Sequence, residues 1–136
     1  MIKVFCNKRG SGKTKALIEM ANKKAGEMKG HVVFINDNEK PLLLLDKAIR
    51  FASTGGFDLK TVNSFYGFLC GIISEDYDID NIYIDHLFNI VDVKIQESEG
   101  LFQLFEKFSN KHNIDLHINV TDDEGVPEFI KKYIVQ

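Results

Sequence analysis

The sequence has no tryptophan, few cysteines and prolines, and no long run of apolar residues. Two cysteines and two prolines occur among 136 residues. The leucine run at residues 42–45 is far shorter than the roughly 20 apolar residues that cross a membrane, and the first residues resemble a strand rather than a secretory signal. No membrane partner is therefore expected. Cys6 and Cys70 lack the spacing of a metal or redox site, which predicts buried, reduced thiols in a cytoplasmic protein.

Arginine is also scarce. Only Arg9 and Arg50 stand among 17 basic residues, so an internal arginine finger has two candidates. The formal net charge of −3 argues against a large nucleic-acid footprint and leaves nucleic acid as a partner without support. Residues 1–29 hold eight basic groups, and residues 75–99 hold eight acids. The basic region would attract an anionic ligand, although two solvated faces of opposite charge would give the same pattern.

The remaining composition is typical of a globular protein. Hydrophobic residues make up 44% of the chain and charged residues 27%. The length suits one domain over residues 1–136, because no linker, repeat or low-complexity tract divides it. Eleven phenylalanines indicate an aromatic core.

Apolar runs that suit buried strands alternate with segments of helical periodicity. Strands are predicted at residues 2–6, 31–35, 59–63, 82–85 and 114–120, and helices at residues 13–28, 41–52, 64–73, 98–108 and 127–134. Gly30 is expected to end the first helix, and Ser64 and Ser98 are expected to cap the third and fourth. This order predicts an α/β fold, a three-layer α/β/α sandwich with a mainly parallel five-stranded sheet.

A glycine-containing loop joins the first predicted strand to the first helix, and it reads Asn7-Lys8-Arg9-Gly10-Ser11-Gly12-Lys13-Thr14. Backbone amides of such a loop, together with those of the helix N-terminus, form an anion-binding site. Gly10 and Gly12 would permit positive φ and close approach of the backbone. Lys13 would reach the β- and γ-phosphates, and the Thr14 hydroxyl would hold Mg²⁺. The loop therefore predicts a nucleoside triphosphate site.

The loop departs from the full phosphate-loop pattern at one position. Asn7 stands where the pattern G-x-x-x-x-G-K-[ST] has its first glycine. Asparagine adopts the left-handed region more readily than most residues, so the turn is expected to persist. The alternative is a glycine turn that only caps an ordinary helix. The succession of strand, loop and helix favours the phosphate site.

A second motif, Asn81-Ile82-Tyr83-Ile84-Asp85, is an apolar strand that ends in aspartate. With both motifs present, the chain resembles the P-loop NTPase superfamily, and within it the RecA-like, additional-strand branch, with a degenerate Walker A loop and Asp85 as the Walker B acid. The resemblance implies binding of ATP and Mg²⁺, with Thr14 and Asp85 at the metal. It also implies a strand between the loop strand and the Asp85 strand. Residues 114–120 are the candidate, with Asn119 or Thr121 as the polar sensor.

The resemblance further implies an acid that activates water, often a glutamate directly after the Walker B aspartate. His86 occupies that position in this chain and is a candidate general base. RecA-like proteins place the acid after the second strand instead, which makes Asp37 and Glu39 candidates. The plainer alternatives are solvated turn acids and a partly buried histidine at a strand end.

Three functions stay open on these residues. The preferred one is ATP binding with weak or partner-dependent hydrolysis, in which a protein partner or a second subunit supplies an arginine. The second is a nucleoside or nucleotide kinase, although the chain lacks the glutamate and the cysteine-bound zinc of the thymidine kinases that it otherwise resembles. The third is a non-catalytic, nucleotide-binding interaction module.

Overall fold

The computed structural model describes residues 1–8, 10, 12–27 and 29–135. Its centre is a sheet of five parallel strands in the order β1-β5-β4-β2-β3. The strands are β1 (Ile2–Asn7), β2 (His31–Asn36), β3 (Arg50–Ser53), β4 (Ile79–Ile84) and β5 (Asp115–Thr121). The predicted α/β class with a mainly parallel five-stranded sheet is therefore confirmed, and all of the pairings are parallel.

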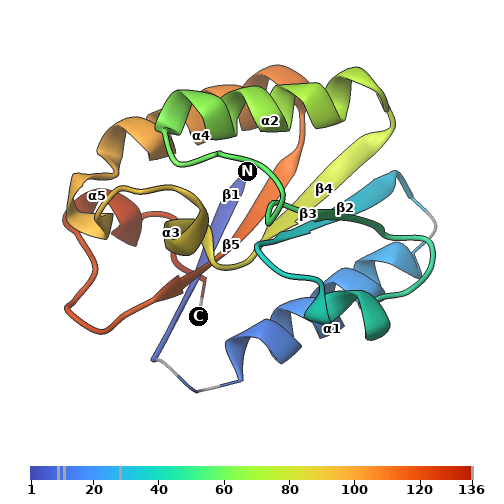
Figure 1. The fold of residues 1–136 in the computed structure, drawn as a ribbon, viewed down its shortest axis with the longest axis horizontal. Helices are drawn as coiled ribbons and strands as arrows, with labels where there is room; N and C mark the ends of the chain where they lie inside the picture. The colour runs from blue at the N-terminus through green and yellow to red at the C-terminus, as the bar shows by residue number, and fades with distance from the viewer. Residues whose placement is uncertain (9, 11, 28, 136) are drawn as a thin grey trace.

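Helices lie on both faces of the sheet, which gives three layers (Figure 1). The long helices are α1 (Lys13–Ala25) on one face, and α2 (Val62–Ser74) and α4 (Glu99–His112) on the other. Two single-turn helices, α3 (Leu87–Ile90) and α5 (Glu128–Lys131), and two 3₁₀ turns, η1 (Lys40–Leu43) and η2 (Ile95–Glu97), complete the described chain. A strand that is covered on both faces needs apolar residues on both, which explains the apolar runs at residues 32–35 of β2 and 82–84 of β4.

The two faces of the sheet differ in chemistry. The face under α2 and α4 is aliphatic and aromatic, with Phe65, Phe105 and Ile84 fully buried in one cluster. The face under α1 carries a stacked aromatic row in which the rings of Tyr83 and His117 lie 4.1 Å apart. Burial lowers the pKa of His117 to about 4, with Lys3 as the second cause. Large phenylalanines therefore form the core predicted from composition, while the α1 face keeps polar groups.

The strand of residues 114–120 lies where the sequence resemblance places it. β5 pairs with β1 on one side and with β4 on the other. In register, Asn7 of β1 lies beside Thr121, and Ile84 of β4 lies beside Ile118. The carboxyl ends of the three strands consequently meet at one edge of the sheet, which is the edge at which ligands bind in open α/β sheets.

Two of the predictions of secondary structure are wrong. Residues 41–52 do not form a helix: they contain the short turn η1 and the start of β3, which pairs with β2 at the sheet edge. The backbone hydrogen bonds that β3 gains from β2 are long-range, and spacing within the segment does not reveal them. The strand predicted at residues 59–63 is absent from the described structure, because Thr61 caps α2 three residues before Ser64. Thr61 and Ser64 form a reciprocal capping box.

Several predicted helix ends also differ. α1 ends at Ala25 and is capped by Gly26 rather than extending to Gly30, and Met28 lies outside the described residues. Ser98 precedes α4 as predicted, but its hydroxyl donates to the carbonyl of Ile95 rather than capping the helix. The last helix stops at Lys131, and Ile134 then forms a parallel bridge with Val4 on the outer edge of β1. None of the described helices is long and apolar enough to span a membrane.

Candidate functional site

The loop between β1 and α1 begins at the carboxyl edge of the sheet. Gly10 and Gly12 both have φ of 78°, in the left-handed region, and Gly12 directly precedes the first residue of α1. A side chain at either position would strain the backbone. Arg9 and Ser11, which belong to the predicted phosphate loop, lie outside the described residues.

Lys13 and Thr14 begin α1 and point toward the ends of β5 and β4. The Lys13 ammonium donates a hydrogen bond to Thr121 Oγ1. The Thr14 hydroxyl donates to Asp85 Oδ2 at 2.7 Å. A hollow of about 330 Å³ opens beside them, and its lining joins the loop to the carboxyl ends of β4 and β5: Gly10, Gly12, Lys13, Thr14, His86, Asn89 and Thr121.

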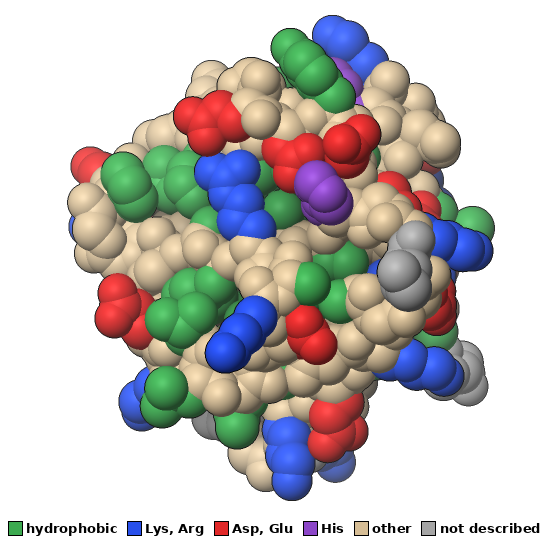
Figure 2. Space-filling view, turned by 90° about the vertical axis from the view of Figure 1, so that its right-hand side faces the viewer, with side chains coloured by type: hydrophobic (Ala, Val, Ile, Leu, Met, Phe, Trp, Pro, Cys, Tyr) green, Lys and Arg blue, Asp and Glu red, His purple; other side chains and the backbone are tan. Residues whose placement is uncertain are grey.

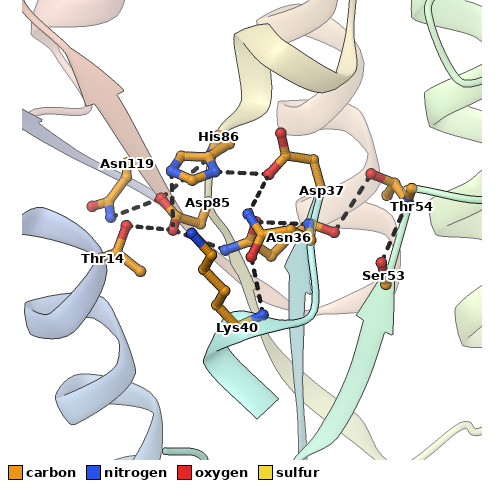
Figure 3. Close-up of polar contacts among 11 residues, drawn as sticks. Thr14, Asn36, Asp37, Lys40, Ser53, Thr54, Asp85, His86 and Asn119 are labelled. Atoms are coloured by element: carbon orange, nitrogen blue, oxygen red, sulfur yellow. Dashed lines mark hydrogen bonds and ion pairs between the residues drawn. The ribbon is translucent and has the colours of Figure 1, made fainter. Parts of the chain in front are cut away.

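Asp85 is the centre of the site, and its side chain is fully buried (Figure 3). Besides the Thr14 hydroxyl, its carboxylate accepts hydrogen bonds from Asn36 Nδ2 at 3.1 Å and from Asn119 Nδ2 at 3.3 Å. The backbone N–H of His86 donates to the same carboxylate at 3.1 Å. Four donors from four different segments therefore fix this carboxylate at the end of β4, and they offset the cost of burying it.

The two asparagines come from the strands on either side of β4. Asn119, one of the two predicted sensor residues, also donates to the carbonyl of Lys13 at 3.0 Å and so connects β5 to the start of α1. Asn36 ends β2, and its backbone carbonyl accepts from the N–H of Thr54 after β3. Asn36 was not among the residues predicted for the site. Its only signal is an asparagine at the end of an apolar run, and many turns share that feature.

His86 follows Asp85 in a backbone conformation that is rare for residues with a side chain. Its φ is 57°, in the left-handed region. Its Nδ1 lies 2.8 Å from Asp37 Oδ1, and its Nε2 lies 3.7 Å from Asp85 Oδ2. Both partners of the His86–Asp37 pair are about 30% exposed. Backbone strain of this kind is commonly found at functional sites. The structure thus brings two of the three predicted catalytic residues, His86 and Asp37, into direct contact.

The third candidate, Glu39, is exposed and precedes η1. Within the described part of the chain, its side chain makes no hydrogen bond or ion pair with Asp85 or His86. Asn7 is the last residue of β1 and Lys8 follows it, and neither belongs to the described lining of the hollow. The Asn7 carbonyl instead accepts from the N–H of Asp122, which ties the end of β1 to the segment after β5.

The arrangement has the chemistry of an anion and cation site. The Lys13 ammonium and the N–H groups of the first turn of α1 supply positive potential. The Thr14 hydroxyl and the Asp85 carboxylate are hard oxygen ligands of the type that Mg²⁺ takes from proteins, in small number, beside phosphate oxygens and water. These donors fit Mg²⁺ better than a soft metal, because neither Cys6 nor Cys70 lies among them.

Comparison with protein-family models gives no match for the chain, and comparison with curated protein sequences gives none either.

Proposed function

We propose that this chain binds a nucleoside triphosphate, ATP in the first instance, together with Mg²⁺ at the carboxyl edge of its sheet. One observation carries the proposal: Thr14, the residue after Lys13 at the start of α1, donates to the buried carboxylate of Asp85 at the end of β4. A loop with two left-handed glycines precedes this pair. The position of β5 between β1 and β4 supports the resemblance to the additional-strand P-loop NTPases.

In this proposal the hydrogen bond of the Lys13 ammonium to a neutral hydroxyl is replaced by stronger hydrogen bonds to phosphate. Its ammonium now donates to the Thr121 hydroxyl. A triphosphate in the hollow would replace this neutral acceptor with phosphate oxygens, and charge-assisted hydrogen bonds are roughly twice as strong as neutral ones. The N–H groups of the first turn of α1 would face the same phosphates.

Thr14 and Asp85 are the residues that would hold the metal ion. When bound, Mg²⁺ would offset the negative charge that develops on the phosphates. Asn36 and Asn119 hold the Asp85 carboxylate from both sides, so its orientation is set before the ligand arrives.

The proposed hydrolysis is slow, because the groups that usually accelerate it are few. His86 replaces the glutamate that would orient a water molecule, and Asp37 holds its ring from the far side. Arg50 begins β3 and pairs with Glu75 at 3.2 Å, at the opposite end of the sheet, so it does not reach this site. A finger from a protein partner or a second copy of the chain would therefore raise the rate.

Calorimetry with Mg·ATP tests the proposal directly. The wild-type chain should bind, and Lys13→Ala should weaken binding by at least about 100-fold, since one charge-assisted contact to phosphate and its neighbours are lost. Lys15→Ala, in the exposed side of the same helical turn, is the matched control and should bind as the wild type does. Unchanged affinity in Lys13→Ala would overturn the assignment of the loop.

Phosphate release then separates the three open functions. Release of phosphate to water, accelerated by a partner, supports the ATPase. Transfer that requires an acceptor supports a kinase. Binding with neither reaction supports a non-catalytic module.

A further inference from the structure

A second hollow adjoins the proposed phosphate site. Its volume is about 490 Å³, which is within the range of small-molecule sites. It shares four lining residues with the first hollow: Lys13, His86, Asn89 and Thr121. The side chains that would lie next to the terminal phosphate therefore also form one wall of the second hollow.

Segments that follow β4 and β5 build the other walls. One wall consists of α3 and residues 93–96, and the opposite wall is the turn at residues 123–125. Gln96 Nε2 donates to the carbonyl of Gly125 at 3.2 Å and so joins the two walls at the rim. The N–H of Asp92 donates to the carbonyl of Lys60 at 2.7 Å, which holds the first wall against the start of α2. The open hollow is thus bounded by two segments whose backbone is held by hydrogen bonds.

The lining combines an apolar surface with groups that recognise hydroxyls. Leu87, Phe88, Val93 and Ile95 supply the apolar part. Besides Lys13 and the residues around Asp85, the polar part consists of two amides, two acids and one lysine. These are Asn89 and Gln96, Asp123 and Glu124, and Lys94. Carboxylates and amides accept hydrogen bonds from hydroxyl groups. The formal charges of the two acids are matched by those of Lys13 and Lys94, so the lining favours a neutral ligand over one that carries its own phosphate.

We propose that the second hollow binds the acceptor of a phosphoryl transfer, a neutral ring compound with several hydroxyl groups such as a nucleoside or a monosaccharide. This inference rests on the proposed function, since the donor is the triphosphate in the first hollow. The apolar surface packs against the ring, and Glu124 accepts a hydrogen bond from a hydroxyl. Another hydroxyl of the acceptor faces the terminal phosphate beside Lys13 and His86.

The transfer balances without a further reactant. The acceptor oxygen forms a bond to the γ-phosphorus, and the bond from that phosphorus to the oxygen that bridges to the β-phosphate breaks. The hydroxyl proton passes to an oxygen of the transferred phosphoryl group and then to solvent. A phosphate monoester and the nucleoside diphosphate leave.

The test measures Mg·ATP binding first and acceptor-dependent ADP formation second. Uridine, adenosine, ribose and glucose are each compared with the corresponding monophosphate, and the product is identified by phosphorus NMR. At least one neutral compound should raise ADP formation by about tenfold or more over hydrolysis alone. Glu124→Gln should raise the KM for that compound roughly tenfold while leaving the affinity for Mg·ATP unchanged. Glu19→Gln, at an exposed position of α1 outside both linings, is the control.

The outcomes distinguish the acceptor site from the nucleotide site. If Mg·ATP binds but no neutral compound accelerates ADP formation, the acceptor site is wrong and the proposed function stands. If only the monophosphates accept the phosphoryl group, the neutral class is wrong. If Mg·ATP does not bind, the proposed function fails at the first measurement, and the acceptor site fails with it.

Discussion

The two ends of the sheet carry the same pair of residue types in opposite surroundings. At the carboxyl end, His86 and Asp37 lie 2.8 Å apart beside the buried carboxylate of Asp85. At the amino end, His31 and Asp76 lie 2.7 Å apart, and the His31 side chain is 58% exposed. The residue types alone therefore do not mark a site. What differs is the buried carboxylate and the number of segments that converge on it.

The amino end is a solvated surface. Figure 2 views the end of the molecule at which α1 leads into β2, and it shows acidic side chains gathered around a histidine. The possible ligand atoms of His31, Asp76 and Asp78 lie within 4.8 Å of one another. The hydrogen bond to Asp76 raises the pKa of His31, and the same bond lowers the pKa of Asp76. Exposed charges of this kind contribute little to stability, because water screens them.

The largest effect is expected from Asp85→Ala. The substitution removes the common acceptor of Thr14, Asn36 and Asn119 at a buried position. Each unsatisfied buried donor costs about 1–3 kcal/mol, so the free energy of unfolding should fall by roughly 3–5 kcal/mol. Urea denaturation measures this loss. A loss no greater than that of an exposed aspartate would show that the carboxyl end is not organised around Asp85.

A pH effect of intermediate size is expected from the buried His117. Its pKa falls from 6.5 to about 4 on folding, so the unfolded chain binds more protons in this window, and stability falls as the pH is lowered through it. The shift corresponds to roughly 3 kcal/mol below pH 4. Urea denaturation from pH 7 to pH 4 should show this fall, and His117→Gln should flatten it while keeping an amide donor for Asn81.

His31→Gln is the control at the exposed end, with the opposite sign. Because the pKa of His31 is raised in the folded protein, its contribution is present below its unfolded pKa and is lost as the pH rises through the raised value. The variant should therefore retain the acid-dependent fall of the wild type. If His31→Gln flattens the curve and His117→Gln does not, the assignment of the effect to the buried histidine is wrong.

A smaller effect is expected from Asn119→Ala. The amide donates both to the Asp85 carboxylate and to the Lys13 carbonyl, so its loss should cost roughly 1–2 kcal/mol in urea denaturation. It should also weaken Mg·ATP binding, because only the Thr14 hydroxyl then joins the start of α1 to the carboxylate. Asn110→Ala on the exposed side of α4 should change neither quantity. Equal effects of the two substitutions would contradict a positioning role for Asn119.

The smallest effect is expected from Asp76→Ala at the amino end. It removes the partner of His31 and the acceptor of the Asp78 N–H, but both hydrogen bonds lie at the exposed surface, so the free energy of unfolding at neutral pH should change by less than about 1 kcal/mol. Mg·ATP affinity should also be unchanged. A marked loss of either would mean that the amino end of the sheet is coupled to the site at the carboxyl end.

The sequence predicted the places of Lys13, Thr14 and Asp85 in the fold better than it predicted the connections between elements. The strand-loop-helix motif placed Lys13 and Thr14 correctly at the start of α1, and the apolar strand placed Asp85 at its carboxyl end. Periodicity failed at residues 41–52, where the short edge strand β3 forms through pairing with β2. Edge pairing depends on a distant partner, and spacing within the segment contains no information about that partner.

The alternation of apolar strands and amphipathic helices determined by itself that the chain builds a layered α/β fold, because such segments bury their apolar surface only by packing on one another. The glycine loop and the terminal aspartate are likewise local features of the sequence. Only the tertiary structure decided that Asn36, Asn119 and Asp85 meet, and that Asp37 holds His86. Strand order sets which carboxyl ends are neighbours, and strand order arises from contacts between residues that lie far apart in the chain.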